Sequence, residues 1–207
     1  MKKILPFQAR TENQKEYIRA IYEHDINFVI GSAGTGKTFL TLALCVKLLQ
    51  EGSYKHVVCC RPLVTCGKEM GYFPGSVSEK VQPFYQALDL VFKSILPIEE
   101  YRKFLDEQLI QFIPLELLRG LTFNNSLLVL DESQNSTYDQ MRTFITRMGV
   151  GSKVIINGDL DQIDIQDSGL EKAIHRLQPL TEVSITEFGP SDIQRHPVLR
   201  KVLEAMK

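Results

Sequence analysis

The stretch INFVIGSAGTGKT, from Ile26 to Thr38, decides the fold of this 207-residue chain. An apolar run, Ile26 to Ile30, leads directly into Gly31 to Thr38, which matches the pattern G-x-x-x-x-G-K-[ST] in full. A helical pattern of apolar residues follows the loop without a break. Strand, loop and helix in this order distinguish a phosphate-binding loop from an ordinary glycine-rich turn.

The residue types of the loop explain how it would hold a triphosphate. Glycines let backbone N–H groups curve around the β-phosphate without a side chain in the way, and the helix beginning near Lys37 directs its positive dipole end at the anion. We expect Lys37 to reach the β- and γ-phosphates and the Thr38 hydroxyl to ligate Mg²⁺. The residues expected to bind ATP are Gly31, Ser32, Ala33, Gly34, Thr35, Gly36, Lys37 and Thr38.

Short apolar runs alternate with helical patterns along the chain. The expected strands are Ile26 to Ile30, His56 to Cys60, Leu127 to Leu130, Val154 to Ile156 and Val183 to Ile185. The helical patterns between them are Thr38 to Leu49, Thr137 to Met148 and Leu170 to Leu177. Strands that alternate with helices form parallel sheets through right-handed crossovers. The sequence predicts one α/β domain over residues 1–207, with three layers and a parallel sheet of about five strands.

One connection is too long for a plain crossover. Between the second and third predicted strands lies an insertion of approximately residues 63–124, with helical patterns at Val77 to Ser94 and Glu99 to Ile110. Long insertions at strand ends often carry function. The alternative is a helical hairpin that only packs, and the sequence does not decide between them.

An acidic pair follows the third predicted strand in LLVLDE, Leu127 to Glu132. Here Asp131 would hold Mg²⁺ through its water shell, and Glu132 would orient or deprotonate the attacking water. An apolar run ending in Asp-Glu is weak evidence alone, since acids also cap helices; the upstream loop makes it persuasive. The immediate Glu favours a hydrolase over a kinase, whose acceptor is a substrate.

Two glutamines are open to two interpretations each. Gln162, beyond the fourth predicted strand, could sense the γ-phosphate, or it could belong to a common Gly-Asp turn. Gln14 could bind the adenine edge, or it could be one residue of a helix whose N-cap is Thr11. Their positions alone do not decide.

Composition excludes several classes. Lys plus Arg number 24 and Asp plus Glu 25, so a globally basic nucleic-acid binder is not indicated. The cysteines, Cys45, Cys59, Cys60 and Cys66, lack Cys-x-x-Cys spacing, and Cys59 and Cys60, which close an apolar run, are interpreted as buried thiols in a strand. The apolar run near the first residue is too short for a signal peptide, and no run of about 18 apolar residues occurs elsewhere. We therefore expect a cytoplasmic protein with no membrane partner.

These motifs together resemble the PhoH-like family, within the additional-strand class of P-loop ATPases related to superfamily-one helicases. The resemblance covers nearly the whole chain. Its stretches are Gly31 to Thr38; Arg61-Pro62 with Gly71 to Gly75; Asp131 to Asn135; Gly158-Asp159 with Gln162 and Asp164; and Asp192 with Arg195 to Pro197. The departures from the family pattern are Ser133 for Ala, Asn157 for Thr, and Thr65-Cys66 for a Glu-Ala pair.

The resemblance implies a RecA-like core that binds and hydrolyses ATP, with RNA or single-stranded nucleic acid as the suspected substrate. It also implies that Gln14 and Gln162 contact the nucleotide. Phosphoryl transfer needs a cation opposite the loop, and Arg195 is the candidate arginine finger. Because one core is present, the resemblance favours a homo-oligomer, with a hexameric ring as one form, in which each subunit completes its neighbour's site.

Two rival functions stay open beside a nucleic-acid-stimulated ATPase with or without helicase activity. One is a small-molecule phosphotransferase, which Glu132 and the insertion disfavour; the other is a nucleotide-binding regulatory module with little turnover. Basic and aromatic residues near the insertion are the candidates for nucleic-acid contact. They are Arg61, Lys68, Tyr72, Phe73 and Lys80. The two aromatic residues could equally pin the loop to the core.

Overall fold

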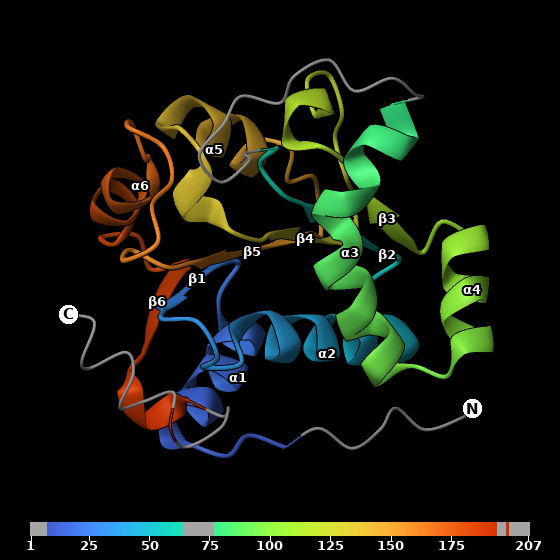
Figure 1. Cartoon of the computed structure of the whole chain (residues 1–207), viewed down its shortest axis with the longest axis horizontal. Coiled ribbons are helices and arrows are strands. Elements are labelled where there is room, and N and C mark those ends of the chain that lie inside the picture. Colours follow the sequence, from blue (N-terminus) through green and yellow to red (C-terminus); the bar gives the residue numbers. More distant parts are fainter. Residues whose placement is uncertain (1–7, 64–76, 194–197, 199–207) are drawn as a thin grey trace.

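A six-stranded, fully parallel sheet forms the centre of the molecule in the computed structural model, which describes residues 8–63, 77–193 and Val198 (Figure 1). The strand order is β3-β2-β4-β5-β1-β6. The strands are β1 Ile26–Gly31, β2 His56–Cys60, β3 Ile110–Phe112, β4 Ser126–Leu130, β5 Lys153–Gly158 and β6 Val183–Phe188.

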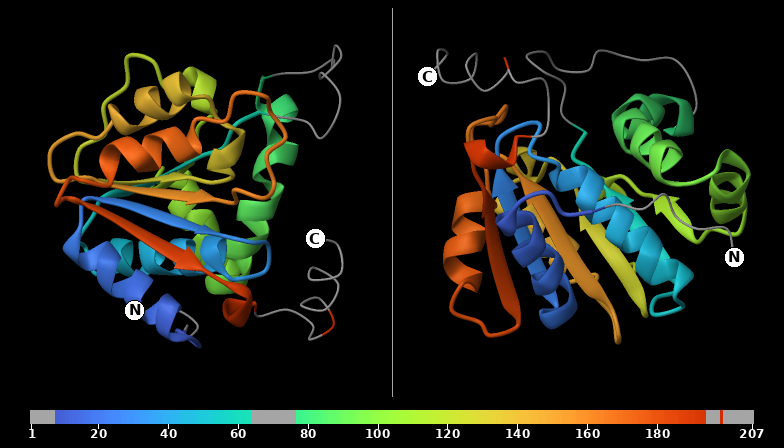
Figure 2. Two further views of the ribbon diagram at one scale, coloured as in Figure 1. Left: turned by 90° about the vertical axis from the view of Figure 1, so that its left-hand side faces the viewer. Right: turned by 90° about the horizontal axis from the view of Figure 1, so that it is seen from below.

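Helices cover both faces of this sheet, as Figure 2 shows. Side chains alternate between the faces of a strand, so Val29, Cys59 and Val129 belong to one apolar cluster and Phe28, Val58 and Leu128 to the other. Helices α1 to α4 contribute to the first cluster, and α5, α6 and η1 to the second. The α-helices are α1 Glu12–Glu23, α2 Lys37–Gln50, α3 Val77–Ile95, α4 Ile98–Asp106, α5 Tyr138–Ile145 and α6 Leu170–Leu177. The 3-10 turns are η1 Leu115–Leu117, η2 Ser133–Asn135 and η3 Pro190–Asp192.

The predicted α/β architecture is confirmed, and each of the five predicted strands is present. The sixth, β3, was missed because it has only three residues and follows a helical pattern. That pattern ends earlier than expected: α4 stops at Asp106, and Gln108 takes a left-handed backbone conformation with φ of 55°. The insertion therefore adds an edge strand to the sheet as well as helices α3 and α4, since β3 pairs with β2.

The order of the strands brings the functional motifs together. Strand β5 lies between β1, which leads into the phosphate-binding loop, and β4, which ends before the acidic pair. Ile30 is opposite Gly158, and Leu130 is opposite Ile156. Since the carboxyl ends of parallel strands share one edge, the three segments meet there, which is where open α/β sheets bind ligands.

Gly31 is required by the sheet as well as by the loop. It pairs with Phe188 of β6, and a Cβ atom added to it would clash with the Phe188 carbonyl oxygen and lie 2.9 Å from the Phe188 Cβ. Its φ of 156° is also one that side chains rarely adopt. A residue predicted as a nucleotide contact therefore also has a packing reason to be glycine.

The interpretation of Cys59 and Cys60 as buried thiols in a strand is confirmed. Cys45, Cys59 and Cys60 are free, buried thiols, and burial raises the pKa of the Cys45 thiol. Cys66 lies outside the described residues. Among the helices of the described ranges, none is long and apolar enough to cross a membrane.

Candidate active site

The phosphate-binding loop is shaped by glycines and by its own lysine. Gly34 and Gly36 have φ of 85° and 90°, values that side-chain-bearing residues avoid. The Lys37 ammonium folds back over the loop and donates to the carbonyl oxygens of Gly31 and of Ser32, the latter at 3.0 Å. Burial lowers the pKa of Lys37, and nearby carboxylates, Asp159 first, oppose that shift. The Lys37 ammonium therefore lies over the backbone of the loop, where the phosphates are expected to bind.

A glutamine from α1 supports the loop from outside. The Gln14 amide donates to the Thr35 carbonyl oxygen at 3.1 Å, and its oxygen accepts from the Arg10 backbone N–H at 2.8 Å. The Thr35 hydroxyl in turn donates to the Ser32 carbonyl oxygen at 2.9 Å. Gln14 is only 3% exposed, so in this conformation it fixes the loop, and its expected contact with adenine stays a prediction. The predicted cap is confirmed, because the Thr11 hydroxyl accepts from the Gln14 backbone N–H.

Asp131 is directly bonded to the loop. The Thr38 hydroxyl donates to Oδ1 of Asp131 at 2.9 Å, and the Asn157 side-chain amide donates to the same oxygen at 3.2 Å. Burial raises the pKa of Asp131, the Glu132 charge raises it further, and Arg61, Asn157 and Thr38 oppose the rise. The two residues expected at the metal thus lie within one hydrogen bond of each other.

A buried chain of donors runs behind Asp131. The Thr41 hydroxyl donates to Oδ1 of Asn157 at 3.0 Å, which uses its single proton. The Tyr17 hydroxyl, 2.5 Å from Thr41, is therefore the donor of that pair, and burial raises the pKa of Tyr17, so that it keeps its proton. The direction of donation, from Tyr17 through Thr41 and Asn157 to Asp131, fixes which way the Asn157 amide is turned.

Glu132 lies beside Asp131 in an uncommon backbone conformation, with φ of 54° and ψ of 41°. Its Oε1 is 3.3 Å from Nη2 of Arg61, and its Oε2 accepts from the Gln134 amide at 2.6 Å. The oxygen of Gln134 accepts from the Asp159 backbone N–H at 3.1 Å. The carboxylate is thus held between the end of β2 and the end of β5.

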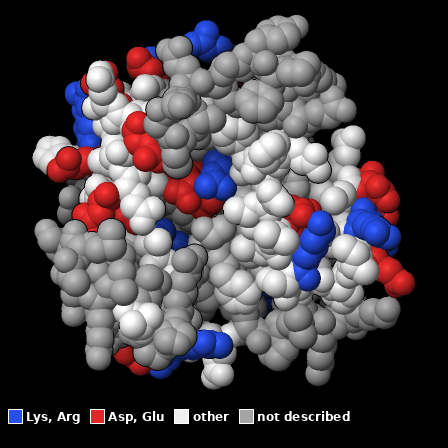
Figure 3. Space-filling model, in the orientation of Figure 1, with Lys and Arg blue, Asp and Glu red and all other residues white. Residues whose placement is uncertain are grey.

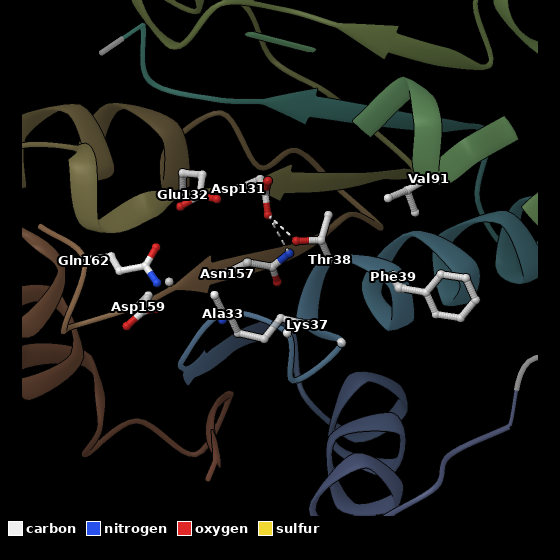
Figure 4. Close-up of a pocket in the computed structure, with 13 residues that line it drawn as sticks. Ala33, Lys37, Thr38, Phe39, Val91, Asp131, Glu132, Asn157, Asp159 and Gln162 are labelled. Atoms are coloured by element: carbon white, nitrogen blue, oxygen red, sulfur yellow. Dashed lines mark hydrogen bonds between the residues drawn. The ribbon is translucent and has the colours of Figure 1, made fainter. Parts of the chain in front are cut away.

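A pocket of about 310 Å³ joins these groups (Figure 4). Its polar part is formed by Lys37, Thr38, Asp131 and Glu132, and Figure 4 places Gln162 and Asp159 at one end and Phe39 and Val91 at the other. A charged region beside an apolar end suits a ligand with a charged group and a flat ring. The lining residues are Ala33, Gly34, Gly36, Lys37, Thr38, Phe39, Val91, Asp131, Glu132, Asn157, Gly158, Asp159 and Gln162.

The structure brings most of the predicted site residues to this pocket or its support. Ala33, Gly34, Gly36, Lys37, Thr38, Asp131, Glu132 and Gln162 line it. The others, Gly31, Ser32, Thr35 and Gln14, hold the loop from behind. The predicted arginine finger, Arg195, lies outside the described residues, as do Lys68, Tyr72, Phe73 and the side chain of Lys80.

The segment that leads towards Arg195 is anchored at the start of α1. The buried carboxylate of Asp192 accepts from the Thr11 hydroxyl, from the Asn13 amide at 2.9 Å and from the Gly189 backbone N–H at 2.7 Å. Gln14, one residue further along this helix, reaches the phosphate-binding loop. Asp192 thereby fixes the chain before Arg195 to the helix that supports the loop.

Five residues of the pocket were not predicted as site residues from the sequence: Phe39, Val91, Asn157, Gly158 and Asp159. Phe39 is 40% exposed and Val91 comes from the insertion helix α3. Asn157 was noted only as a departure from a family pattern, although a polar residue at the carboxyl end of an apolar strand could have marked it. Burial raises the pKa of Asp159, and its Oδ2 is buried without a hydrogen-bond partner in the structure.

The residues fit Mg²⁺ and a phosphate chain. The Thr38 hydroxyl and the Asp131 carboxylate are hard oxygen donors. Within the described ranges no group of three or more His, Cys, Asp or Glu side chains could hold a metal ion by itself. That donor set suits Mg²⁺, which proteins bind through one or two carboxylates together with substrate phosphates and water.

Charge on the surface is mixed. Figure 3 shows basic and acidic side chains interspersed on the face it presents, with no broad basic area among the residues described there. This agrees with the net charge of −1. Any nucleic-acid contact on this part of the molecule would therefore depend on single, well-placed cations.

Two known structures share the fold. The large terminase of a thermophilic bacteriophage superposes with a TM-score of 0.64 at 10% identity, covering 97% of this chain and 51% of that chain. The SWI2/SNF2 ATPase core of Sulfolobus solfataricus superposes with a TM-score of 0.52 at 13% identity, covering 87% of this chain and 45% of that chain. At these identities the likeness concerns the fold alone.

Sequence relatives are much closer. The PhoH-like protein of Bacillus subtilis (strain 168) is 37% identical over 201 residues, 96% of this chain and 63% of that protein. Protein PhoH of Escherichia coli (strain K12) is 32% identical over 205 residues, 97% of this chain and 58% of that protein. The chain therefore spans less than two thirds of the length of these relatives. A family model described as PhoH-like protein matches residues 6–207, and this chain belongs to the PhoH-like protein family.

Proposed function

We propose that this chain is a Mg²⁺-dependent ATPase whose turnover is coupled to RNA or another single-stranded nucleic acid. The observation that carries the proposal is the hydrogen bond of 2.9 Å between Thr38 and Asp131. It joins the phosphate-binding loop to the strand end that also bears Glu132. A site that only bound nucleotide would need the loop, but a hydrolase also needs a base beside the metal.

Each residue of the pocket has a proposed role. Bound Mg²⁺ would neutralise charge on the β- and γ-phosphates during transfer. Lys37 would turn from the carbonyl oxygens of Gly31 and Ser32 to the phosphates, and Thr38 and Asp131 would hold the metal. Phe39, at the apolar end of the pocket, would pack against the ribose or base.

The attacking water would be activated at the end of the pocket opposite Phe39 and Val91. Glu132 would accept a proton from the attacking water or orient it. Gln162, which lines the same end, would hydrogen-bond the γ-phosphate and report its presence to the loop after β5. Arg195 of a neighbouring subunit would supply the transition-state cation, in a homo-oligomer such as a hexameric ring.

The choice of ligands to test also follows from proteins of the same fold. The phage large terminase was solved with ADP, and the Sulfolobus SWI2/SNF2 core with double-stranded DNA. Nucleotide and nucleic acid are therefore the first ligands to offer to this chain. Whether strands are unwound or only bound is a separate question, which a strand-displacement assay answers.

Phosphate release, measured with and without single-stranded RNA, tests the proposal. Release that depends on Mg²⁺ and rises with the RNA supports it. ATP binding without release would identify a regulatory module instead, and transfer to an added small-molecule acceptor without release to water would identify a phosphotransferase. The Lys37→Ala protein is the control, because release that persists in it comes from a contaminant.

A further inference from the structure

Arg61 lies at the end of β2 and makes two contacts that join the site to the insertion. Its Nη2 is 3.3 Å from Oε1 of Glu132, and its Nη1 donates to the Phe84 carbonyl oxygen of α3 at 3.1 Å. The Arg61 side chain is 23% exposed, and that of Glu132 is 38% exposed. One planar guanidinium thus spans the proposed base and a helix of the insertion.

These contacts determine where the Glu132 carboxylate points. One oxygen is paired with Arg61 and the other accepts from Gln134, so both are directed at protein donors. A general base works only if it lies within hydrogen-bond reach of the proton that it takes. Each oxygen keeps a lone pair for a further donor, but the two contacts fix the direction of the carboxylate, and turning it towards a water beside the γ-phosphate loosens one of them. Gln134 is buried and held by Asp159, which leaves Arg61 as the partner that can move.

The hydrogen bond to the Phe84 carbonyl oxygen connects Arg61 to α3, a helix of the insertion. The helix that accepts from Arg61 through Phe84 also places Val91 in the pocket. A guanidinium has five N–H donors in a planar fork that matches phosphate geometry, and two of its nitrogens are engaged here. A backbone phosphate of a nucleic-acid strand bound at the carboxyl ends of the β-strands could therefore replace the Glu132 carboxylate as the partner of Arg61.

We propose that Arg61 is a positioning residue that holds Glu132 away from the attacking water, and that a nucleic-acid phosphate releases Glu132 by taking the guanidinium. This inference rests on the proposed ATPase function and adds its regulation. Without nucleic acid, Arg61 restrains Glu132; when nucleic acid is bound, Arg61 binds one of its phosphates instead. Removing Arg61 should then raise the basal rate and remove the stimulation.

The experiment compares steady-state phosphate release by the parent, Arg61→Ala, Arg61→Lys and Arg102→Ala, with and without single-stranded RNA. In Arg61→Ala we expect basal kcat to rise about two- to fivefold, which corresponds to the free energy of a partly exposed ion pair. We expect KM for ATP to stay unchanged. The ratio of stimulated to basal rate should fall towards one. Arg61→Lys keeps the charge, so its basal rate should return close to the parent's. Arg102 is an exposed arginine of α4, and its variant should behave as the parent.

A second comparison shows whether the effect passes through Glu132. In a Glu132→Gln background, Arg61→Ala should give no gain, because the group it restrains is gone. If Arg61→Ala does not fold, Arg61→Gln takes its place, with the same rise expected from loss of the charge.

Other results overturn the inference. A folded Arg61→Ala protein that binds ATP but hydrolyses it no faster than the parent shows no restraint. A fall in basal kcat would instead mean that the guanidinium assists the reaction directly. If the basal rate rises but RNA still stimulates the variant, a nucleic-acid phosphate does not act through Arg61, and that part of the proposal is wrong. Failure of the ATPase proposal is distinguishable from these, since the parent then releases no phosphate, or releases no more than the Lys37→Ala control.

Discussion

The side-chain amide of Asn157 donates to Oδ1 of Asp131, the oxygen that also accepts from the Thr38 hydroxyl. Strand β5 carries Asn157 between the strand that leads into the phosphate-binding loop and the strand that ends at the acidic pair. With both donors on Oδ1, the other carboxylate oxygen is left for the water shell of a metal. Asn157 thereby orients the carboxylate as well as neutralising part of its charge.

Asn157→Leu should therefore impair the reaction more than it impairs the fold. The change leaves the Thr41 hydroxyl without its acceptor and Asp131 without one donor, which costs about 1–3 kcal/mol for unpaired buried groups. We expect at least about a tenfold loss of kcat and a higher Mg²⁺ requirement. Phosphate release across a Mg²⁺ series and a melting curve measure the two effects.

Tyr17→Phe is the matched control for this chain of hydrogen bonds. It removes the donor furthest from Asp131, and Thr41 still donates to Asn157. Stability should fall by about 0.5–1.5 kcal/mol while the Mg²⁺ requirement stays that of the parent. If Asn157→Leu needs no more Mg²⁺ than the parent, Asn157 only packs.

Lys37→Ala should remove most of the affinity for ATP without unfolding the protein. The ammonium bonds only to loop carbonyl oxygens among the described residues, so no core contact is lost. A charge-assisted hydrogen bond is worth about 1.5–3 kcal/mol, which predicts about a 10- to 100-fold weaker Kd. Fluorescence of a labelled ATP analogue measures it, with the exposed Lys55→Ala as control. A variant that binds as the parent does would contradict the assignment of the loop.

Glu132→Gln should separate binding from turnover. The amide keeps the shape and can still bond to Gln134, but it cannot accept a proton from water. We expect ATP to bind as in the parent and kcat to fall by about 10²-fold or more. Removal of Mg²⁺ with a chelator should abolish release in every variant. Glu171→Gln, on the exposed face of α6, is the matched control; equal turnover in the Glu132 variant would point to another base.

The phosphate-binding loop and most of the sheet could be predicted because their signals are local. Eight consecutive residues specify the loop, and runs such as His56–Cys60 are apolar along nearly their whole length. Strand β3 could not be predicted, since three residues carry no period of their own and pairing with β2 is what makes them a strand.

The partners of the site residues were out of reach for a different reason. Asp131 and Asn157 are 26 positions apart, and only the strand order makes them neighbours. The sequence likewise identified Arg61 and Glu132 separately, as a nucleic-acid contact and a base, and gave no sign that they touch. Contacts of this kind depend on tertiary structure, which one sequence without a sheet order does not determine.

Gly31→Ala should destabilise the sheet in addition to any effect on nucleotide binding. The new Cβ would clash with the Phe188 carbonyl oxygen across the β1–β6 pair. Overpacking of this kind costs about 1–3 kcal/mol, and each kcal/mol lowers Tm by about 2–4 °C for a chain of this size. Gly52→Ala is the control, because Gly52 has φ of 75° but nothing within 4 Å of an added Cβ. If the Gly31→Ala protein has the same Tm as the Gly52→Ala protein, β6 moves aside to make room for the new Cβ.

Arg195 offers a test of assembly. We expect Lys37→Ala and Arg195→Ala each to be nearly inactive alone, because one lacks the loop cation and the other the transition-state cation. In a ring of head-to-tail contacts, random mixing joins an intact loop to an intact arginine at about a quarter of the interfaces. Part of the activity should then return on mixing, with co-assembly checked by mass. A mixture that stays inactive although co-assembled places Arg195 within its own subunit or outside the reaction. An active, ATP-bound protein that is monomeric by light scattering would refute the ring.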